Sequence, residues 1–168
     1  MSTPTHILVG VGIAYWTSLA YPQETWSFIL PVSILTANLP DIDTLLYGIS
    51  HRHRTESPLH YPIVWILGMI LAVVCLWLLG SPVPWERVWI ISMGVGSHLI
   101  LDTIGVNGGL AWLGPLHRHE YSLFPMVKRR KTPLENAIIY IHHPSFIIEI
   151  GIWVGAIIYA MRYVYPTL

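Results

Sequence analysis

The sequence predicts an all-α integral membrane protein, a helical bundle of about four to five membrane segments that forms a single domain over residues 1–168. Charged residues make up only 11% of the chain, whereas a typical soluble domain contains about 25%. Apolar residues make up 54%, and the mean hydropathy is +0.56. The chain also has eight Trp and nine Tyr, side chains that concentrate at membrane–water interfaces. So few charges cannot cover a soluble protein of this length, and a net charge of zero gives no support for a nucleic-acid partner.

Two apolar segments begin the chain, at residues 7–21 and 26–39, and we expect them to form a short helical hairpin. The turn is predicted at residues 22–25, and Pro31 should kink the second segment. A signal peptide is the alternative for the first segment. It is less well supported, because the first six residues contain no Lys or Arg to form the basic leader of such a peptide.

Three longer apolar segments are predicted to cross the bilayer, at residues 61–79, 88–104 and 146–165. A crossing helix needs about 20 apolar residues, and the segment at 61–79 contains no charged side chain. Ser57 followed by Pro58 predicts the start of this helix, with Ser57 as the N-cap and Pro58 as the first helical residue.

A further helix is predicted before the final span. Thr132, Pro133 and Glu135 have the spacing of a capping box with proline at the first helical position. This helix should run to about His142, and Pro144 should end or kink it.

The distribution of Lys and Arg predicts the orientation of the bundle. With five segments and a cytoplasmic N-terminus, the loops at 41–57 and 105–144 are cytoplasmic, which is where positive residues concentrate. These two loops hold seven of the nine cations, namely Arg52, Arg54, Arg118, Lys128, Arg129, Arg130 and Lys131.

Acidic and histidine residues gather at the same predicted membrane face. His6 begins the first segment, and Asp41 and Asp43 end the second. His98 and Asp102 lie toward the cytoplasmic end of the fourth segment. Because the orientation rests on Lys and Arg alone, this convergence is partly independent support for a polar site. Ionisable side chains within a membrane segment are costly and commonly functional.

Two pairs of residues carry most of this prediction. His98 and Asp102 are four residues apart, so a helix places both on one face, where they can bind one metal ion. The alternative is a hydrogen bond between packed helices. Asp41 and Asp43 point the same way in an extended segment, and two carboxylates at a bilayer edge repel each other unless a cation lies between them. The alternative for this pair is a turn at a helix end.

The loop after the Asp pair supplies further candidates. His51 is a candidate metal ligand, and Glu56 is a candidate ligand or general base. His60 is either a ligand or an anchor at the membrane interface, and His6 is a further candidate ligand. We expect the remaining histidines to be loop, solvent-exposed or interface residues: His53, His117, His119, His142 and His143.

In this order, the motifs resemble a known family, the bacterial and archaeal inner-membrane proteins described as membrane-bound metal-dependent hydrolases, the YdjM-like group. The similarity covers about residues 6–125. The family pattern has an early His, a Leu-Pro-Asp-x-Asp run, a His-Arg loop ending in Thr-His-Ser, a helical His-x-x-x-Asp motif and a later turn. The matching residues are His6, Leu39-Pro40-Asp41-Ile42-Asp43, His51-Arg52, Thr55-Glu56-Ser57, Ser97-His98 to Asp102, Gly108-Gly109, Leu113-Gly114-Pro115 and Tyr121-Ser122-Leu123.

The resemblance implies a multi-pass protein of the cell inner membrane that hydrolyses its substrate with metal-activated water. Imidazole and carboxylate ligands without thiolate suit Zn²⁺, Mn²⁺ or Fe²⁺. A free carboxylate, Glu56 or Asp43, would accept a proton, and Arg52 or Arg54 would hold an anionic group of the substrate. A site at headgroup depth on the cytoplasmic face favours a lipid ester or phosphoester, with the bilayer as the partner and no protein partner predicted. The metal-ligand candidates are His6, Asp41, Asp43, His51, Glu56, His98 and Asp102.

One departure from the family pattern keeps other function classes open. The Thr-His-Ser of the family is Thr55-Glu56-Ser57 here, so Glu replaces a candidate metal-binding His. Glu can ligate through oxygen, and His60 is a candidate replacement, but the change also favours a non-catalytic protein with a structural or vestigial metal site. The other class is a metal or proton transporter, which needs a polar path across the bilayer. The outer half offers only Glu24, Glu86, Arg87 and Arg162 for such a path.

Overall fold

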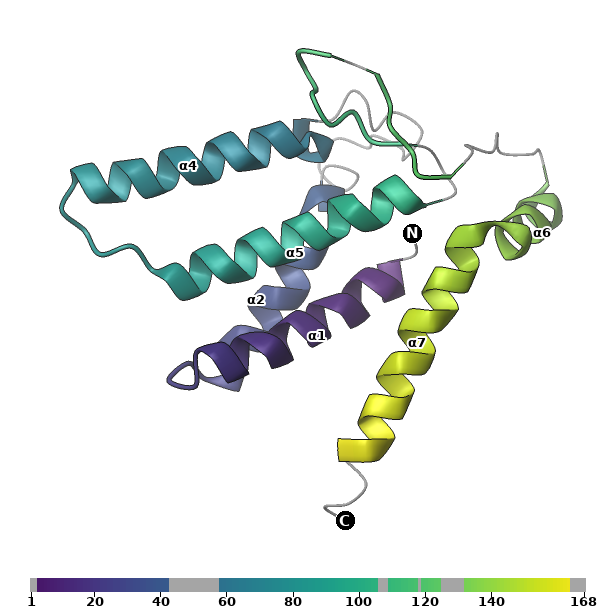
Figure 1. Ribbon diagram of the computed structural model, residues 1–168, viewed down its shortest axis with the longest axis horizontal. Helices are drawn as coiled ribbons and strands as arrows, with labels where there is room; N and C mark the ends of the chain where they lie inside the picture. Colours follow the sequence, from purple (N-terminus) through teal and green to yellow (C-terminus); the bar gives the residue numbers. More distant parts are fainter. Residues whose placement is uncertain (1–2, 43–57, 106–108, 118, 125–131, 164–168) are drawn as a thin grey trace.

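In the computed structural model of the chain, α5 (Trp85–Ile104) packs against α1 (Thr3–Ala20), α2 (Trp26–Asn38) and α4 (Pro62–Leu78), whereas α7 (Pro144–Tyr163) packs against α1 (Figure 1). The described residues form six α-helices, two short 3-10 helices and no β-strand, which confirms the predicted all-α class. One isolated antiparallel bridge joins Leu110 and Tyr121. The structure describes residues 3–42, 58–105, 109–117, 119–124 and 132–163.

The predicted N-terminal hairpin is present as α1 (Thr3–Ala20) and α2 (Trp26–Asn38). Pro31 lies inside α2 and does not end it. A Cβ atom added at Gly10 would lie only 2.9 Å from the Cα atom of Ile34. Glycine therefore lets the backbones of α1 and α2 approach more closely than a side chain would permit, as small residues do between membrane helices.

The start of α4 (Pro62–Leu78) differs from the sequence prediction, which placed it at Pro58. Residues Pro58–His60 instead form a 3-10 helix, η3. Tyr61, with φ −97° and ψ 109°, then interrupts the helical path. The ring of Pro62 disfavours a helical backbone at the preceding residue, and proline itself suits the first position of a helix. The predicted N-cap, Ser57, lies outside the described residues.

α5 begins at Trp85, three residues before the predicted boundary, and packs against both α1 and α2. A Cβ atom added at Gly94 would lie 3.0 Å from the backbone nitrogen of Ala37, and closer still to the side chain of Thr36. Gly94 thus brings α5 against the last turn of α2. The face of α5 covered in this way carries His98 and Asp102, both fully buried.

The capping box predicted at Thr132 is confirmed. The backbone N–H of Glu135 donates to Thr132 Oγ1 at 3.3 Å, and the backbone N–H of Thr132 donates to Glu135 Oε2 at 3.4 Å. This box begins α6 (Pro133–His142), and α7 (Pro144–Tyr163) follows directly. The break between the two helices at Pro144 is the one that the sequence predicts.

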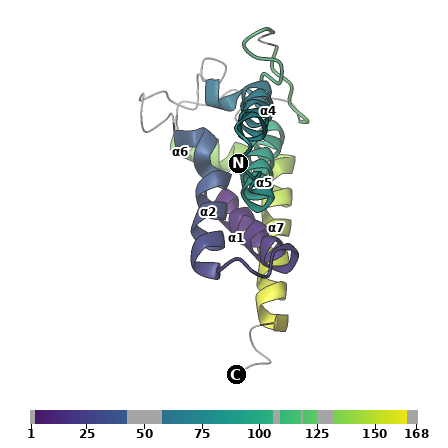
Figure 2. The same cartoon turned by 90° about the vertical axis from the view of Figure 1, so that its left-hand side faces the viewer.

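Among the described helices, one is long and apolar enough to cross a membrane by length and composition, over Pro144–Arg162 of α7. α4 is apolar but shorter, at 17 residues. A larger number of crossings therefore stays a prediction. The ring of Tyr159 in α7 contacts Tyr15 of α1, with 5.0 Å between the ring centroids. The C-terminal end of α7 extends beyond the other helices (Figures 1 and 2).

The close packing at Gly94 yields a stability prediction. Gly94→Ala should lower the free energy of unfolding by about 1–3 kcal/mol, because the added methyl group meets α2 in a well-packed interface. Gly12→Ala is the matched control, since nothing lies within 4 Å of a Cβ atom at Gly12. The control should leave stability unchanged or raise it by up to about 1 kcal/mol through helix propensity. Thermal unfolding of the purified protein in detergent measures both, and equal stability of the two variants would contradict the tight α2–α5 contact.

Candidate metal centre

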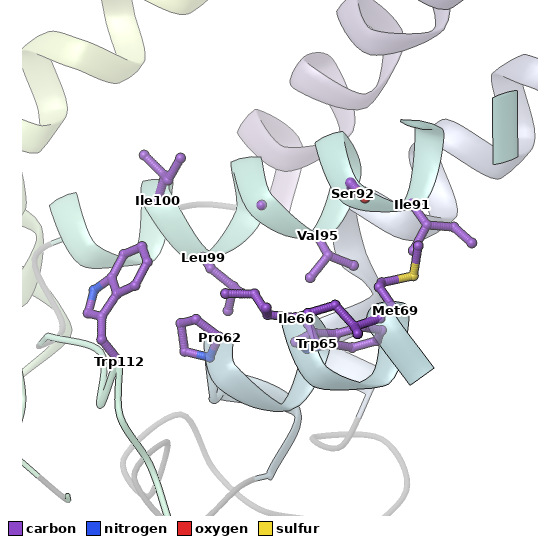
Figure 3. A pocket seen from close by; sticks show the side chains of 12 residues that line it. Pro62, Trp65, Ile66, Met69, Ile91, Ser92, Val95, Leu99, Ile100 and Trp112 are labelled. Atoms are coloured by element: carbon purple, nitrogen blue, oxygen red, sulfur yellow. The ribbon is translucent and has the colours of Figure 1, made fainter. Parts of the chain in front are cut away.

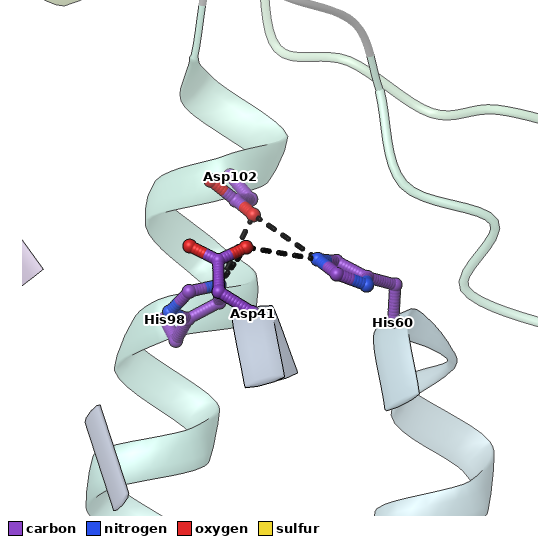
Figure 4. Close-up of side chains that lie close together, drawn as sticks. All are labelled: Asp41, His60, His98 and Asp102. Atoms are coloured by element: carbon purple, nitrogen blue, oxygen red, sulfur yellow. Dashed lines mark hydrogen bonds and ion pairs between the residues drawn. The ribbon is translucent and has the colours of Figure 1, made fainter. Parts of the chain in front are cut away.

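Four side chains converge where α2 and α5 end and α4 is about to begin. Asp41, His60, His98 and Asp102 each offer one ligand atom, and these atoms all lie within 4.8 Å of one another (Figure 4). We refer to these four residues as the four-residue cluster. Asp41 comes from η1 (Leu39–Asp41), which continues α2, and His60 comes from η3. His98 and Asp102 come from α5.

The α5 pair has the geometry that its spacing predicts. His98 Nε2 lies 3.2 Å from Asp102 Oδ2, one helical turn away. The other ring nitrogen, His98 Nδ1, lies 2.8 Å from the carbonyl oxygen of Ala37. A carbonyl oxygen only accepts hydrogen bonds, so Nδ1 carries the proton and donates it. In the neutral ring, Nε2 therefore keeps its lone pair and points it at the cluster, the arrangement by which a backbone carbonyl orients a metal-binding histidine.

Asp41 closes the cluster from the side of α2. Its Oδ1 atom lies 3.3 Å from His60 Nε2 and 3.6 Å from His98 Nε2. Burial by itself raises the pKa of the Asp41 carboxyl, but the hydrogen bond from His60 and the nearby ring of His98 outweigh burial and hold this pKa well below its usual range. Asp41 is therefore a carboxylate at neutral pH, which is the form that binds metals.

His60 completes the cluster from the side of α4. Its Nε2 atom lies 3.9 Å from Asp102 Oδ2 in addition to its contact with Asp41. The His60 side chain is 2% exposed, and the Asp41 side chain is 19% exposed. His98 and Asp102 have no exposed side-chain surface. Solvent therefore reaches the four-residue cluster from the side of Asp41.

His6 of α1 lies against the cluster without belonging to it. Its ring stacks on that of His98, with centroids 4.0 Å apart and an interplanar angle of 21°. Its Nε2 atom lies 3.6 Å from Asp102 Oδ1. Asp102 is thus approached by histidines on both of its oxygen atoms. This places His6 where it can either bind a metal itself or orient the Asp102 carboxylate.

The hydrogen bonding of these buried nitrogens tests whether the cluster suits a metal. Within the described part of the chain, no hydrogen bond reaches His98 Nε2 or either ring nitrogen of His6. A buried polar atom without a partner costs about 1–3 kcal/mol. A cation bound between two imidazoles and two carboxylates would give His98 Nε2 the partner it lacks. The donor set, with no thiolate in it, suits Zn²⁺, Mn²⁺ or Fe²⁺.

The structure brings some of the predicted site residues together and leaves others undescribed. His6, Asp41, His98 and Asp102 lie within or against the cluster. The other predicted residues, Asp43, His51, Arg52 and Glu56, lie outside the described residues, so their roles stay predictions.

His60 is the member that the sequence left undecided between a ligand and an interface anchor. The signal that could have separated these roles is its place between Pro58 and Pro62, which holds it in a short turn ahead of α4. His143, by contrast, pairs with Ser145, with 2.8 Å between Nδ1 and Oγ, and His142 is exposed on α6. Neither of these two is part of the cluster.

Comparison with known proteins gives one match. A family model described as "YdjM inner membrane protein" matches residues 1–167, which is nearly the whole chain. No match was found among curated proteins or among solved structures. On the strength of this match, the chain belongs to the YdjM inner membrane protein family.

Proposed function

We propose that this chain is a multi-pass inner-membrane hydrolase that binds a divalent metal at the four-residue cluster and cleaves an ester or phosphoester bond of a lipid. One observation carries the proposal. His98 is fully buried, its Nδ1–H is held by the Ala37 carbonyl, and its Nε2 faces the carboxylates of Asp41 and Asp102. Such an arrangement is costly as mere helix packing, and it is the usual environment of a metal-binding histidine.

The chemistry divides between the metal and the side chains. When bound, a divalent metal supplies the means to activate water near neutral pH and to stabilise negative charge. His60, His98, Asp41 and Asp102 would hold it. His6 Nε2 lies 3.6 Å from the other oxygen of Asp102, where it would help to orient this carboxylate. From the sequence, we assign proton acceptance to Glu56 or Asp43 and the binding of an anionic substrate group to Arg52.

The proposed membrane arrangement takes α1, α2, α4, α5 and α7 as the five segments. Apolar side chains on the outer surface support it, since Trp77 of α4 is 72% exposed and Ile147 of α7 is 73% exposed. A lipid environment would cover such surfaces. The cluster lies at the helix ends that lead into the loops with seven of the nine Lys and Arg residues. By the positive-inside rule, this end faces the cytoplasm.

A structural metal in a non-catalytic protein is the second candidate, because Glu56 stands where the family pattern has His. The same cluster serves both functions. Metal binding without hydrolysis of any ester or phosphoester would identify the non-catalytic protein. Metal content and hydrolysis are therefore measured separately.

The first prediction concerns metal content. The purified wild-type protein should carry stoichiometric metal by elemental analysis, and His98→Ala and Asp102→Asn should lose it to a similar extent. An amide is a weaker donor than a carboxylate and removes one negative charge facing the cation. The matched control is His142→Ala. His142 is exposed on α6, so its substitution should leave the metal content unchanged. Full metal content in Asp102→Asn beside its loss in His98→Ala would remove Asp102 from the ligand set.

The second prediction concerns activity. Detergent-solubilised protein should hydrolyse a fluorogenic lipid ester or phosphoester, a chelator should abolish this, and one of Zn²⁺, Mn²⁺ or Fe²⁺ should restore it. His6→Ala should lower activity or metal affinity about 10–100-fold, as the loss of a group that orients a ligand does. If His6→Ala instead behaves like wild type in both assays, the contact between His6 and Asp102 has no role in the site.

The third prediction concerns topology. A reporter fused after Leu168 should lie in the periplasm, and one inserted beside Lys131 should lie in the cytoplasm, because the candidate span in α7 lies between them. Alkaline phosphatase and green fluorescent protein fusions measure the two positions. Signals from the same side at both positions would contradict the five-segment arrangement.

A further inference from the structure

A groove runs between α4 and α5, close to the end of α5 that carries the four-residue cluster (Figure 3). It has a volume of about 380 Å³, within the range of about 300–1,000 Å³ that small-molecule sites occupy. None of the described side chains that line it is charged, and Ser92 contributes the one hydroxyl group among them. The groove therefore suits a hydrocarbon ligand.

The walls of the groove are held in place by hydrogen bonds and packing. The indole N–H of Trp65 donates to the carbonyl oxygen of Leu59 at 2.7 Å. The indole N–H of Trp112 donates to Thr103 Oγ1 at 3.2 Å. Both rings pack against a buried apolar cluster that includes Leu99. Because the two polar groups of these walls are already satisfied, each indole presents only apolar surface to a ligand.

The groove and the four-residue cluster share α5, and the cluster also lies next to the start of α4. Leu99, which lines the groove, directly follows His98 along α5. Pro62, which also lines it, comes two residues after His60. On the outer side, Ile66 and Ile100 are 57% and 53% exposed, so the groove opens to the surroundings of the helices. The polar cluster and the uncharged groove are thus neighbours along α5 and along the segment that leads from η3 into α4.

We propose that this groove binds an acyl chain of the lipid whose headgroup meets the four-residue cluster. The placement of the headgroup at the cluster rests on the proposed function. The size of the groove argues against a helix of another protein, since a helix about 10 Å wide that rises about 5.4 Å per turn fills roughly 400 Å³ with each turn. A single acyl chain is thinner than a helix. It is also apolar along its length, as the lining of the groove is.

The groove contributes position rather than hydrophobic free energy, because the bilayer already surrounds an acyl chain with apolar groups. An acyl chain held between α4 and α5 would keep the ester or phosphoester group beside the cluster. Blocking the groove should therefore weaken the use of long-chain lipids while sparing a water-soluble substrate that has no acyl chain.

Gly96 offers the variant that tests this. It lines the groove, and nothing lies within 4 Å of a Cβ atom built on it. Gly96→Leu should therefore fill the groove without displacing the backbone. The matched control is Gly68→Leu on α4, where a Cβ atom also meets nothing within 4 Å and the residue does not line the groove. Should Gly96→Leu give little folded protein, Ser92→Leu fills the groove from the preceding turn of α5.

The binding experiment uses a lysophosphatidic acid with a photoreactive diazirine in its acyl chain, added to the full-length protein in detergent. Peptide mass spectrometry should find saturable labelling at groove residues such as Met69 and Ile100, and excess unlabelled lysophosphatidic acid should compete. Gly96→Leu should lower this labelling roughly tenfold or more, the scale on which extra methylene groups change occupancy of an apolar pocket. Gly68→Leu should label like wild type.

The outcomes separate the groove from the proposed function. Labelling of Gly96→Leu at the wild-type level, or equal labelling on the outer faces of α1 and α7, would overturn the groove proposal. Crosslinks between two chains through the groove would do the same by identifying a second copy as the occupant. Saturable labelling in a protein that hydrolyses neither lipids nor soluble esters and phosphoesters would keep the acyl-chain site and reject the hydrolase.

Discussion

The hydrogen bond from His98 Nδ1 to the carbonyl oxygen of Ala37, at 2.8 Å, is the interaction on which the rest of the site depends. It joins α5 to the last turn of α2, and the two residues are 61 positions apart in the sequence. By placing the proton on Nδ1, it leaves Nε2 of the neutral ring to face Asp41 and Asp102. A single backbone carbonyl thus sets both the tautomer and the orientation of the central histidine.

This bond forms because the helices approach closely. Gly94 has no side chain to hold α5 away from Thr36 and Ala37, and Gly10 has none to hold α1 away from α2. The same approach seals His6 and His98 from solvent, with their rings stacked. Tight packing of small residues therefore creates the buried polar site, whose nitrogens would gain from a bound cation because they are sealed from bulk solvent.

The position of the cluster gives the molecule a polar end and an apolar body. The chain belongs to an inner membrane protein family, and α7 is long and apolar enough to cross a membrane. At the polar end, Asp41 is the side chain through which solvent reaches the cluster. The groove lined by Trp65 and Trp112 lies between α4 and α5, beside the part of α5 that carries His98. An amphiphile has the matching arrangement, with a polar head for the cluster and an apolar chain for the groove.

The sequence by itself determined the features that depend on neighbours along the chain. The spacing of His98 and Asp102 fixes a shared helical face, and Thr132 and Glu135 close a capping box within one turn. Apolar composition likewise determined the helical class. α4 begins at Pro62 and not at Pro58 because the ring of Pro62 holds the backbone of Tyr61 out of the helical region, and the capping signal at Ser57 and Pro58 does not carry this restriction.

Only the tertiary structure decided which polar residues meet. Asp41 and His60 are 19 residues apart, and their contact at 3.3 Å requires η1 and η3 to be brought together by the packing of α2, α4 and α5. No periodicity in the sequence encodes that distance, so the sequence supports a metal ligand and an interface anchor equally well for His60. The physical reason is that local spacing fixes the direction of a side chain on its own helix, whereas the partner it meets depends on how closely other helices pack.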